Sequence, residues 1–125
     1  NFNIDIAPDV DASSVRIPSM FIQIMTENSI KHALRNKEGI KLLSITVRHE
    51  HNNTVIRVTD NGPGFNPVTL RRKTGMNIIS QTIAVINLHN KDKIRFDIHN
   101  IYSSDGKQIK GCEAMLKVPD GVKIE

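Results

Sequence analysis

The chain has 125 residues, 38% of them hydrophobic and 24% charged, which fits one domain over residues 1–125 and excludes a disordered tail or a collagen-like repeat. Its net charge is +4, but only 4% of the residues are aromatic and the densest basic run covers just residues 71–73, so nucleic-acid binding is not expected. The lone Cys112 has no disulfide partner and no stretch approaches the roughly 20 apolar residues of a membrane span, so we expect a reducing, cytoplasmic setting.

Alternating residues and turn chemistry predict the secondary structure in chain order. Phe2, Ile4 and Ile6 alternate with polar residues and predict a short strand over residues 3–6. Pro18 favours the start of a helix, which we expect to reach Leu34. The remaining predicted elements are strands 42–50 and 54–60, a Gly- and Pro-rich loop 61–73, a helix 74–88, and strands 94–99 and 112–118.

The order of these elements predicts the fold class. Strands that follow one another in pairs form hairpins, so the sheet should be mixed and mostly antiparallel. Two helices on one face of such a sheet give a two-layer α/β sandwich, an α+β arrangement. A doubly wound parallel sheet is excluded, because its strands and helices would have to alternate singly.

Asp60 is a candidate binding residue because the alternation of its strand places it on the side that faces the core. It ends the predicted strand 54–60 on the same side as Ile56 and Val58, the side that should face the core. A carboxylate there costs several kcal/mol of desolvation unless a donor reaches it. The glycine-rich turn that follows would let a ligand approach the backbone closely. The alternative is that Asp60 caps its own turn by accepting a hydrogen bond from the backbone of Gly62.

A polar cluster on the first predicted helix is a second candidate. Asn28, Lys31 and His32 stand at i, i+3 and i+4 and would share one helical face, below Phe21 and Ile24. An Asn amide oxygen suits Mg²⁺, which commonly takes phosphate oxygens as further ligands, and a lysine and a histidine nearby would contact the phosphates. The alternative is that the helix turns into solvent at its C-terminal end, where its dipole favours cations.

A basic segment before the second helix is the third candidate. Arg71, Arg72, Lys73 and Thr74 precede Gly75 at the predicted helix start. Cations are unfavourable beside the positive end of a helix dipole, whereas free backbone N–H groups there suit a phosphate. A bound anion would explain the basic residues, and an ordinary solvated basic loop is the alternative.

Together, in chain order, these features resemble the ATP-binding signature of the GHKL superfamily, which comprises gyrase, Hsp90, histidine kinases and MutL. Residues 17–33 (IPSMFIQIMTENSIKHA) match the N box of sensor histidine kinases similar to the LytS and YehU types. Residues 60–65 (DNGPGF) match the G1 box, and residues 74–77 (TGMN) resemble the G2 region. The resemblance covers essentially the whole chain and implies the Bergerat fold of this superfamily.

The resemblance also implies roles for the polar helix and the strand end. Asn28 would coordinate the Mg²⁺ that bridges the ATP phosphates, and Lys31 would act with it in catalysis. His32 would lie near the phosphates or the ribose. Asp60 would accept a hydrogen bond from the exocyclic amine of adenine.

The same resemblance assigns the glycine-rich segments. Gly62 and Gly64 would let the chain pass close to the base. Residues 66–74 would form a lid over the triphosphate, with Thr74 and Gly75 near the phosphates. Lys73 and Ile78 depart from the usual second glycine box, in which a glycine and an asparagine occupy these two positions.

The implied function is that of the catalytic domain of a two-component sensor histidine kinase. It would bind Mg-ATP and transfer the γ-phosphate to a histidine on an upstream dimerisation domain. Because the sequence begins at Asn1 rather than Met, we expect a C-terminal fragment of a longer protein. The full-length protein would be a homodimer anchored in the bacterial inner membrane, with a response regulator as partner and this domain in the cytoplasm.

Two alternatives stay open at this point. One is another GHKL enzyme, an ATPase or a serine kinase. Ile24 speaks against the ATPase, because the hydrolysing relatives carry an acidic base at that position, one helical turn before the metal-binding Asn. The other is a degenerate GHKL domain that serves as a protein-docking module, which the altered glycine box would fit.

Overall fold

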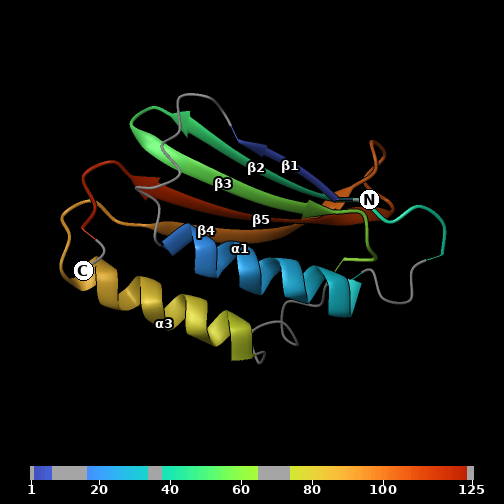
Figure 1. Ribbon diagram of the computed structural model, residues 1–125. Coiled ribbons are helices and arrows are strands. Elements are labelled where there is room, and N and C mark those ends of the chain that lie inside the picture. Colours follow the sequence, from blue (N-terminus) through green and yellow to red (C-terminus); the bar gives the residue numbers. More distant parts are fainter. Residues whose placement is uncertain (1, 7–16, 34–37, 65–73, 124–125) are drawn as a thin grey trace.

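The computed structural model describes residues 2–6, 17–33, 38–64 and 74–123 (Figure 1). The described elements, in chain order, are β1 Phe2–Ile6, α1 Ile17–Asn28, a π-helical turn η2 Ser29–Ala33, β2 Leu43–Glu50, β3 Asn53–Asp60, α3 Thr74–Leu88, β4 Arg95–Tyr102 and β5 Ile109–Pro119. In the described residues, no helix is long and apolar enough to cross a membrane.

The five strands form one sheet in the order β1-β2-β3-β5-β4. β1 runs parallel to β2, and the other neighbours pair antiparallel. Both α-helices lie on the same face of this sheet (Figure 1). The predicted two-layer sandwich with a mixed, mostly antiparallel sheet is therefore confirmed, and so are both predicted hairpins.

The core lies between the sheet and the helices. The two-residue periodicity of the strands and the three- and four-residue steps of the helices bring apolar side chains to one interface, as expected from the sequence. At its centre Phe21 of α1 contacts Phe96 of β4 edge to face, with ring centroids 5.5 Å apart. The buried core residues are Phe21, Met25, Leu43, Ile45, Val47, Ile56, Val58, Met76, Ile79, Ile86, Ile94, Ala114 and Leu116.

The turn between β2 and β3 uses two residues in the left-handed region. His51 has φ 49° and Asn52 has φ 65°. A two-residue hairpin loop with positive φ at both positions matches the right-handed twist of its strands. The amide of Asn53 donates to the carbonyl oxygen of His51 at 2.9 Å and closes the turn. The hairpin expected at residues 51–53 is confirmed, and it pins the register of β2 against β3.

Three elements differ by several residues from their predicted extents. β4 and β5 run beyond the expected ranges 94–99 and 112–118, because their ladder pairs backbones and does not need alternating apolar side chains. The first helix is α-helical only to Asn28 and continues as a π-helical turn. Leu34, its predicted end, lies outside the described residues.

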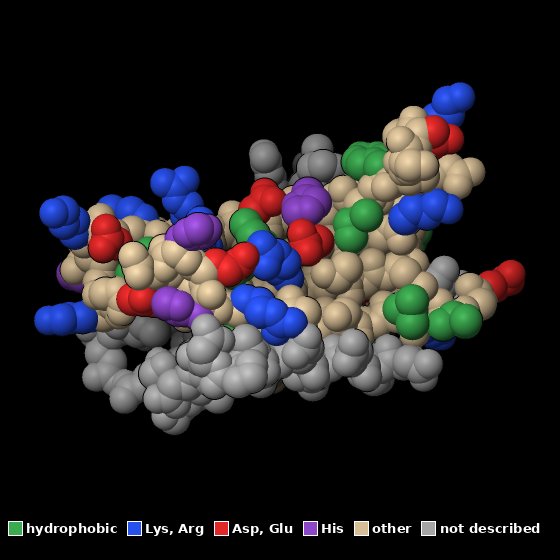
Figure 2. Space-filling model, turned by 90° about the horizontal axis from the view of Figure 1, so that it is seen from above, with side chains coloured by type: hydrophobic (Ala, Val, Ile, Leu, Met, Phe, Trp, Pro, Cys, Tyr) green, Lys and Arg blue, Asp and Glu red, His purple; other side chains and the backbone are tan. Residues whose placement is uncertain are grey.

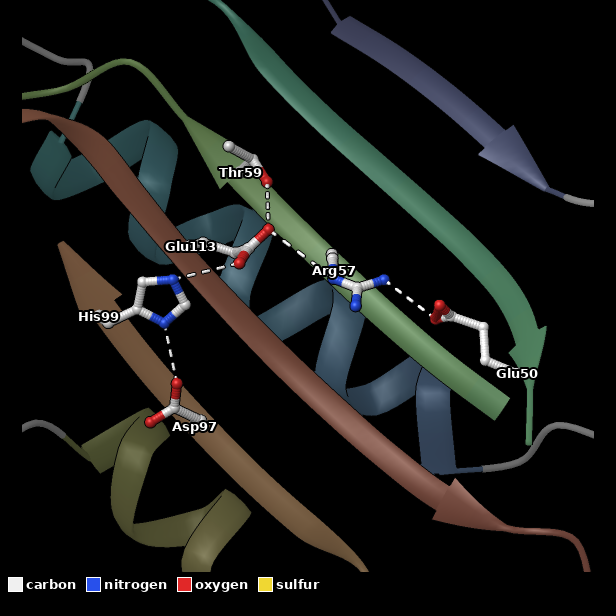
Figure 3. Close-up of polar contacts among 6 residues, drawn as sticks. All are labelled: Glu50, Arg57, Thr59, Asp97, His99 and Glu113. Atoms are coloured by element: carbon white, nitrogen blue, oxygen red, sulfur yellow. Dashed lines mark hydrogen bonds and ion pairs between the residues drawn. The ribbon is translucent and has the colours of Figure 1, made fainter. Parts of the chain in front are cut away.

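The sheet face away from the helices carries a chain of charged side chains (Figure 3). Arg57 contacts Glu50 at 3.4 Å and Glu113 at 3.9 Å. His99 contacts Glu113 at 3.2 Å through Nε2 and Asp97 at 2.8 Å through Nδ1. These groups are partly solvated, so each pair contributes at most about 1 kcal/mol. The central part of this face is thus polar, with three carboxylates arranged around one arginine and one histidine.

Candidate functional site

Asp60 is the buried charged residue at the end of β3. Its exposed fraction is 6%, and it lies on the helix-facing side with Ile56 and Val58, which are 0% and 2% exposed. The parity argument is therefore confirmed for this residue. A carboxylate held in such surroundings needs donors, and the next question is which groups supply them.

Two donors reach the Asp60 carboxylate from different elements. The hydroxyl of Ser29 donates to Oδ2 at 2.8 Å, and the backbone N–H of Gly62 donates to Oδ1 at 2.9 Å. The turn-capping bond to Gly62 is thus present, together with a bond to the helix layer that the sequence did not indicate. An ionised carboxylate accepts about four hydrogen bonds, so both oxygens keep acceptor capacity for a ligand.

The backbone around Asp60 is held on both sides. Asn61 accepts from the N–H of Leu42 at 2.8 Å and donates to the carbonyl oxygen of Ile40 at 2.9 Å. On the other side β5 passes so closely that a Cβ on Gly111 would overlap the Asp60 carbonyl oxygen and lie 3.1 Å from the Asn61 Cα. The carboxylate therefore projects from a closely packed strand end.

The glycine-rich turn after Asp60 packs against the β4–β5 hairpin. Gly64 has φ +85°, a conformation that side chains rarely adopt. A Cβ there would lie 2.6 Å from Oδ1 of Asn100 and 2.7 Å from Cγ2 of Ile109. Both the dihedral angle and the space require glycine at this position, so the turn sits close to the hairpin.

Asn28 lies where α1 meets the start of α3. Its Nδ2 is buried and has no hydrogen-bond partner within the described part of the chain. Gly75 of α3 faces it: a Cβ built there would be 3.7 Å from Asn28 Nδ2 and 2.8 Å from Cγ2 of Ile24. An unpaired buried amide calls for an explanation, and a ligand that enters between the helices would supply one.

The π-helical turn changes the expected layout of the polar helix. It begins at Ser29, directly after Asn28. Bonding from i to i+5 turns the chain less per residue, so the α-helical spacing that was assumed for Asn28, Lys31 and His32 does not hold. Lys31 is exposed. The side chain of His32 lies outside the described residues, and so do the side chain of Thr74 and residues 66–73 of the expected lid.

Cys112 is a neighbour of the site that the sequence did not single out. It pairs with Asp60 across β3 and β5 and is 8% exposed. Burial, together with the negative charges of Asp60 and Glu113, raises the pKa of its thiol to about 12. The thiol is therefore protonated at neutral pH and behaves as a small apolar group.

Comparison with known proteins finds relatives among bacterial sensor proteins. The sensor protein LytS of Staphylococcus haemolyticus is 31% identical over 81 residues, which are 65% of this chain and 14% of that protein. The sensor histidine kinase YpdA of Escherichia coli is 30% identical over 80 residues, which are 64% of this chain and 14% of that protein. No protein-family model matches the chain.

Solved structures share the fold at low identity. The histidine kinase domain of the Erythrobacter litoralis blue-light activated histidine kinase superposes with a TM-score of 0.69 at 12% identity, over 94% of this chain and 50% of that one. The catalytic domain of histidine kinase ThkA gives a TM-score of 0.64 at 13% identity, over 98% of this chain and 81% of that one.

By sequence the chain is related to the LytS group of sensor histidine kinases, and it shares the fold of histidine kinase catalytic domains. It spans only 14% of the length of the two curated relatives above. The relation to the LytS group agrees with the N-box and G1-box resemblance, whose key residues Asn28 and Asp60 occupy buried or half-buried positions between the layers.

Sequence reasoning missed three neighbours of Asp60, namely Ser29, Cys112 and Gly111. Ser29 reaches Asp60 only because α1 packs over the end of β3. Gly111 and Cys112 reach it only through the pairing of β3 with β5. The parity of Cys112 with Ala114 and Leu116 did indicate a core position, but the register that places it beside Asp60 required the structure.

Proposed function

We propose that the chain is the ATP-binding catalytic domain of a two-component sensor histidine kinase. The observation that carries the proposal is the buried Asp60 carboxylate, which has one donor on each oxygen and spare acceptor capacity. In this role it accepts a hydrogen bond from the exocyclic amine of adenine. Guanine carries a carbonyl oxygen in the same place, which would face the carboxylate unfavourably, so the site selects adenine.

The residues around Asn28 fit a magnesium-bound triphosphate. The amide oxygen of Asn28 is the kind of neutral oxygen ligand that Mg²⁺ accepts, and its buried, unpaired Nδ2 can donate to a phosphate oxygen. Because Gly75 has no side chain, the backbone of α3 comes close to this amide and to Ile24. When bound, the metal would neutralise charge on the transferred phosphoryl group.

Ile24 separates phosphotransfer from hydrolysis. It lies one helical turn before Asn28, half-buried against the core and beside Gly75. An apolar side chain cannot accept a proton from water, so this chain offers no general base there. The phosphoryl acceptor is then a histidine supplied by an upstream dimerisation domain, and catalysis by this chain is positioning and charge neutralisation.

The names of the relatives also support a proposal about the full-length protein and its partners. We place the chain in a homodimeric sensor kinase whose dimerisation domain presents the acceptor histidine and whose response regulator receives the phosphoryl group. The full-length protein would be anchored in the inner membrane, with this domain in the cytoplasm.

The test measures ATP affinity with and without Mg²⁺ for the wild type, Asn28→Ala and Gln23→Ala. Gln23 carries the same kind of amide on the exposed side of the same helix, so its variant is the matched control. We expect Mg²⁺ to tighten ATP binding in the wild type and in the control and to have little effect in Asn28→Ala. Equal binding by all three proteins without magnesium dependence would argue for a degenerate docking module.

A second measurement follows turnover. The isolated chain should hydrolyse ATP negligibly, while the full-length protein should phosphorylate its own histidine and lose this activity with Asn28→Ala. Brisk ATP hydrolysis by the isolated chain would favour a GHKL ATPase instead.

A further inference from the structure

A hollow of about 460 Å³ lies at the end of the sheet opposite to Asp60. The turn between β2 and β3 borders it on one side, and the connection from α3 to β4 borders it on the other. These two segments are far apart in the sequence and lie at the same end of the fold (Figure 1). The volume is in the range of small-molecule sites.

Two basic residues of this hollow face each other without an acidic partner among the described residues. Arg95 of β4 and Lys117 of β5 both line it and stand directly opposite each other in the antiparallel ladder. Cross-strand neighbours project from the same face, so two cations meet there, and like charges in this position destabilise a sheet. Neither side chain has an ion pair or a hydrogen bond within the described part of the chain.

Elsewhere on the same sheet face, an arginine is paired with acidic residues. Arg57, two residues along β3 from Val55, contacts two carboxylates. The row that contains Arg95 and Lys117 continues through Val55 to Arg48 of β2 and contains no acidic residue. Figure 2 looks onto this face, and Lys and Arg side chains are most numerous at its left end, the end at which the β2–β3 turn and the connection from α3 to β4 lie in Figure 1.

A third cation is fixed at the rim. The ammonium group of Lys93 donates to the carbonyl oxygens of Asn87 and Asn90 at 2.6 and 2.5 Å, at the C-terminal end of α3. Asp92 is the acidic residue that lines the hollow, so three cations face one carboxylate there. The lining is therefore positively charged, and backbone carbonyl groups hold Lys93 in place.

We propose that this hollow binds a small oxyanion that carries a phosphate or carboxylate group. Arg95 would contact it through its planar guanidinium and Lys117 through its ammonium group, with the amide of Asn52 as a neutral donor at the turn. The ligand would relieve the repulsion between the two opposed cations. The site is separate from the nucleotide site, because the two lie at opposite ends of β3.

The test is a titration of the whole chain, followed by the amide resonances in two-dimensional NMR spectra at constant ionic strength. The probes are inorganic phosphate and citrate. We expect at least one of them to give saturable shifts at Asn52, Lys93 and Arg95. In Arg95→Gln/Lys117→Gln the affinity should fall at least tenfold. The matched control is Lys107→Gln/Lys110→Gln, which removes two exposed cations at the other end of the sheet and should leave the affinity unchanged.

Several outcomes would overturn the proposal. These are the absence of saturation with both probes, equal affinity in the Arg95→Gln/Lys117→Gln variant, or shifts spread over every lysine-bearing surface. Shifts that phosphate causes near Gly62 or Gly75 belong to the nucleotide site and should persist in the double variant. If that variant does not fold, Lys117→Gln alone serves, and phosphate should raise the melting temperature of the wild type more than that of this variant.

Discussion

Gly111 offers the sharpest structural test of how Asp60 is held. Alanine at this position would place a Cβ onto the Asp60 carbonyl oxygen, 3.0 Å from the Asp60 carbonyl carbon and 3.1 Å from the Asn61 Cα. All three atoms are backbone, so relief requires β3 and β5 to separate at the end that carries the carboxylate. Overpacking of this kind costs about 1–3 kcal/mol.

The expected net effect follows from two opposing terms. Replacing glycine by alanine lowers the entropy of the unfolded chain, which stabilises by about 0.4–1 kcal/mol. The overlap outweighs this gain, so Gly111→Ala should lower the free energy of unfolding by roughly 1–2 kcal/mol. With a urea m-value of about 2 kcal/mol/M, the midpoint of urea unfolding falls by about 0.5–1 M.

The matched control is Gly121→Ala. A Cβ on Gly121 has no neighbouring atom within 4 Å, so only the entropy term acts and this variant should raise the free energy of unfolding by about 0.4–1 kcal/mol. Urea unfolding of the two variants and the wild type, followed by circular dichroism, gives the comparison. Equal midpoints for Gly111→Ala and Gly121→Ala would refute the claim that close backbone packing positions Asp60.

Three further expectations concern the surroundings of the carboxylate. Ser29→Ala removes a donor from the buried Asp60 charge and should lower the free energy of unfolding by about 2 kcal/mol, whereas an unchanged urea midpoint would contradict the bond. Thr26→Val should raise that free energy by roughly 1 kcal/mol, because the buried Thr26 hydroxyl has no partner in the described residues; a fall would show that it has one. The raised pKa of Cys112 means that its contribution is intact below pH 9 and is lost as the pH rises toward 12. Urea midpoints at pH 8 and pH 10 should therefore fall less for Cys112→Ala than for the wild type, and parallel falls would contradict the shift.

Much of the fold could be predicted because side-chain periodicity reports burial. The helix expected over residues 74–88 has those bounds in the structure, since Met76, Ile79 and Ile86 mark a continuous buried stripe. The position of Asp60 could be predicted for the same reason, because strand parity places it with Ile56 and Val58.

The remaining features depend on contacts between distant segments. The bond from Ser29 to Asp60 spans 31 positions and needs α1 to cross the end of β3. The overlap at Gly111 and the opposition of Arg95 and Lys117 follow from strand register, which no local pattern specifies here. The spacing of the apolar residues likewise does not indicate the π-helical turn after Asn28. The prediction that Asn28 and Lys31 share one helical face therefore assumed α-helical geometry.

The central claim is that Asp60 accepts a hydrogen bond from the exocyclic amine of adenine. A comparison of ATP and GTP affinities by calorimetry tests it most directly. When the carbonyl oxygen of guanine faces the buried carboxylate, several kcal/mol of binding free energy are lost, so the wild type should bind ATP at least about 100-fold more tightly than GTP. Asp60→Asn should bring the two affinities much closer together. Equal binding of ATP and GTP by the wild type would contradict the account.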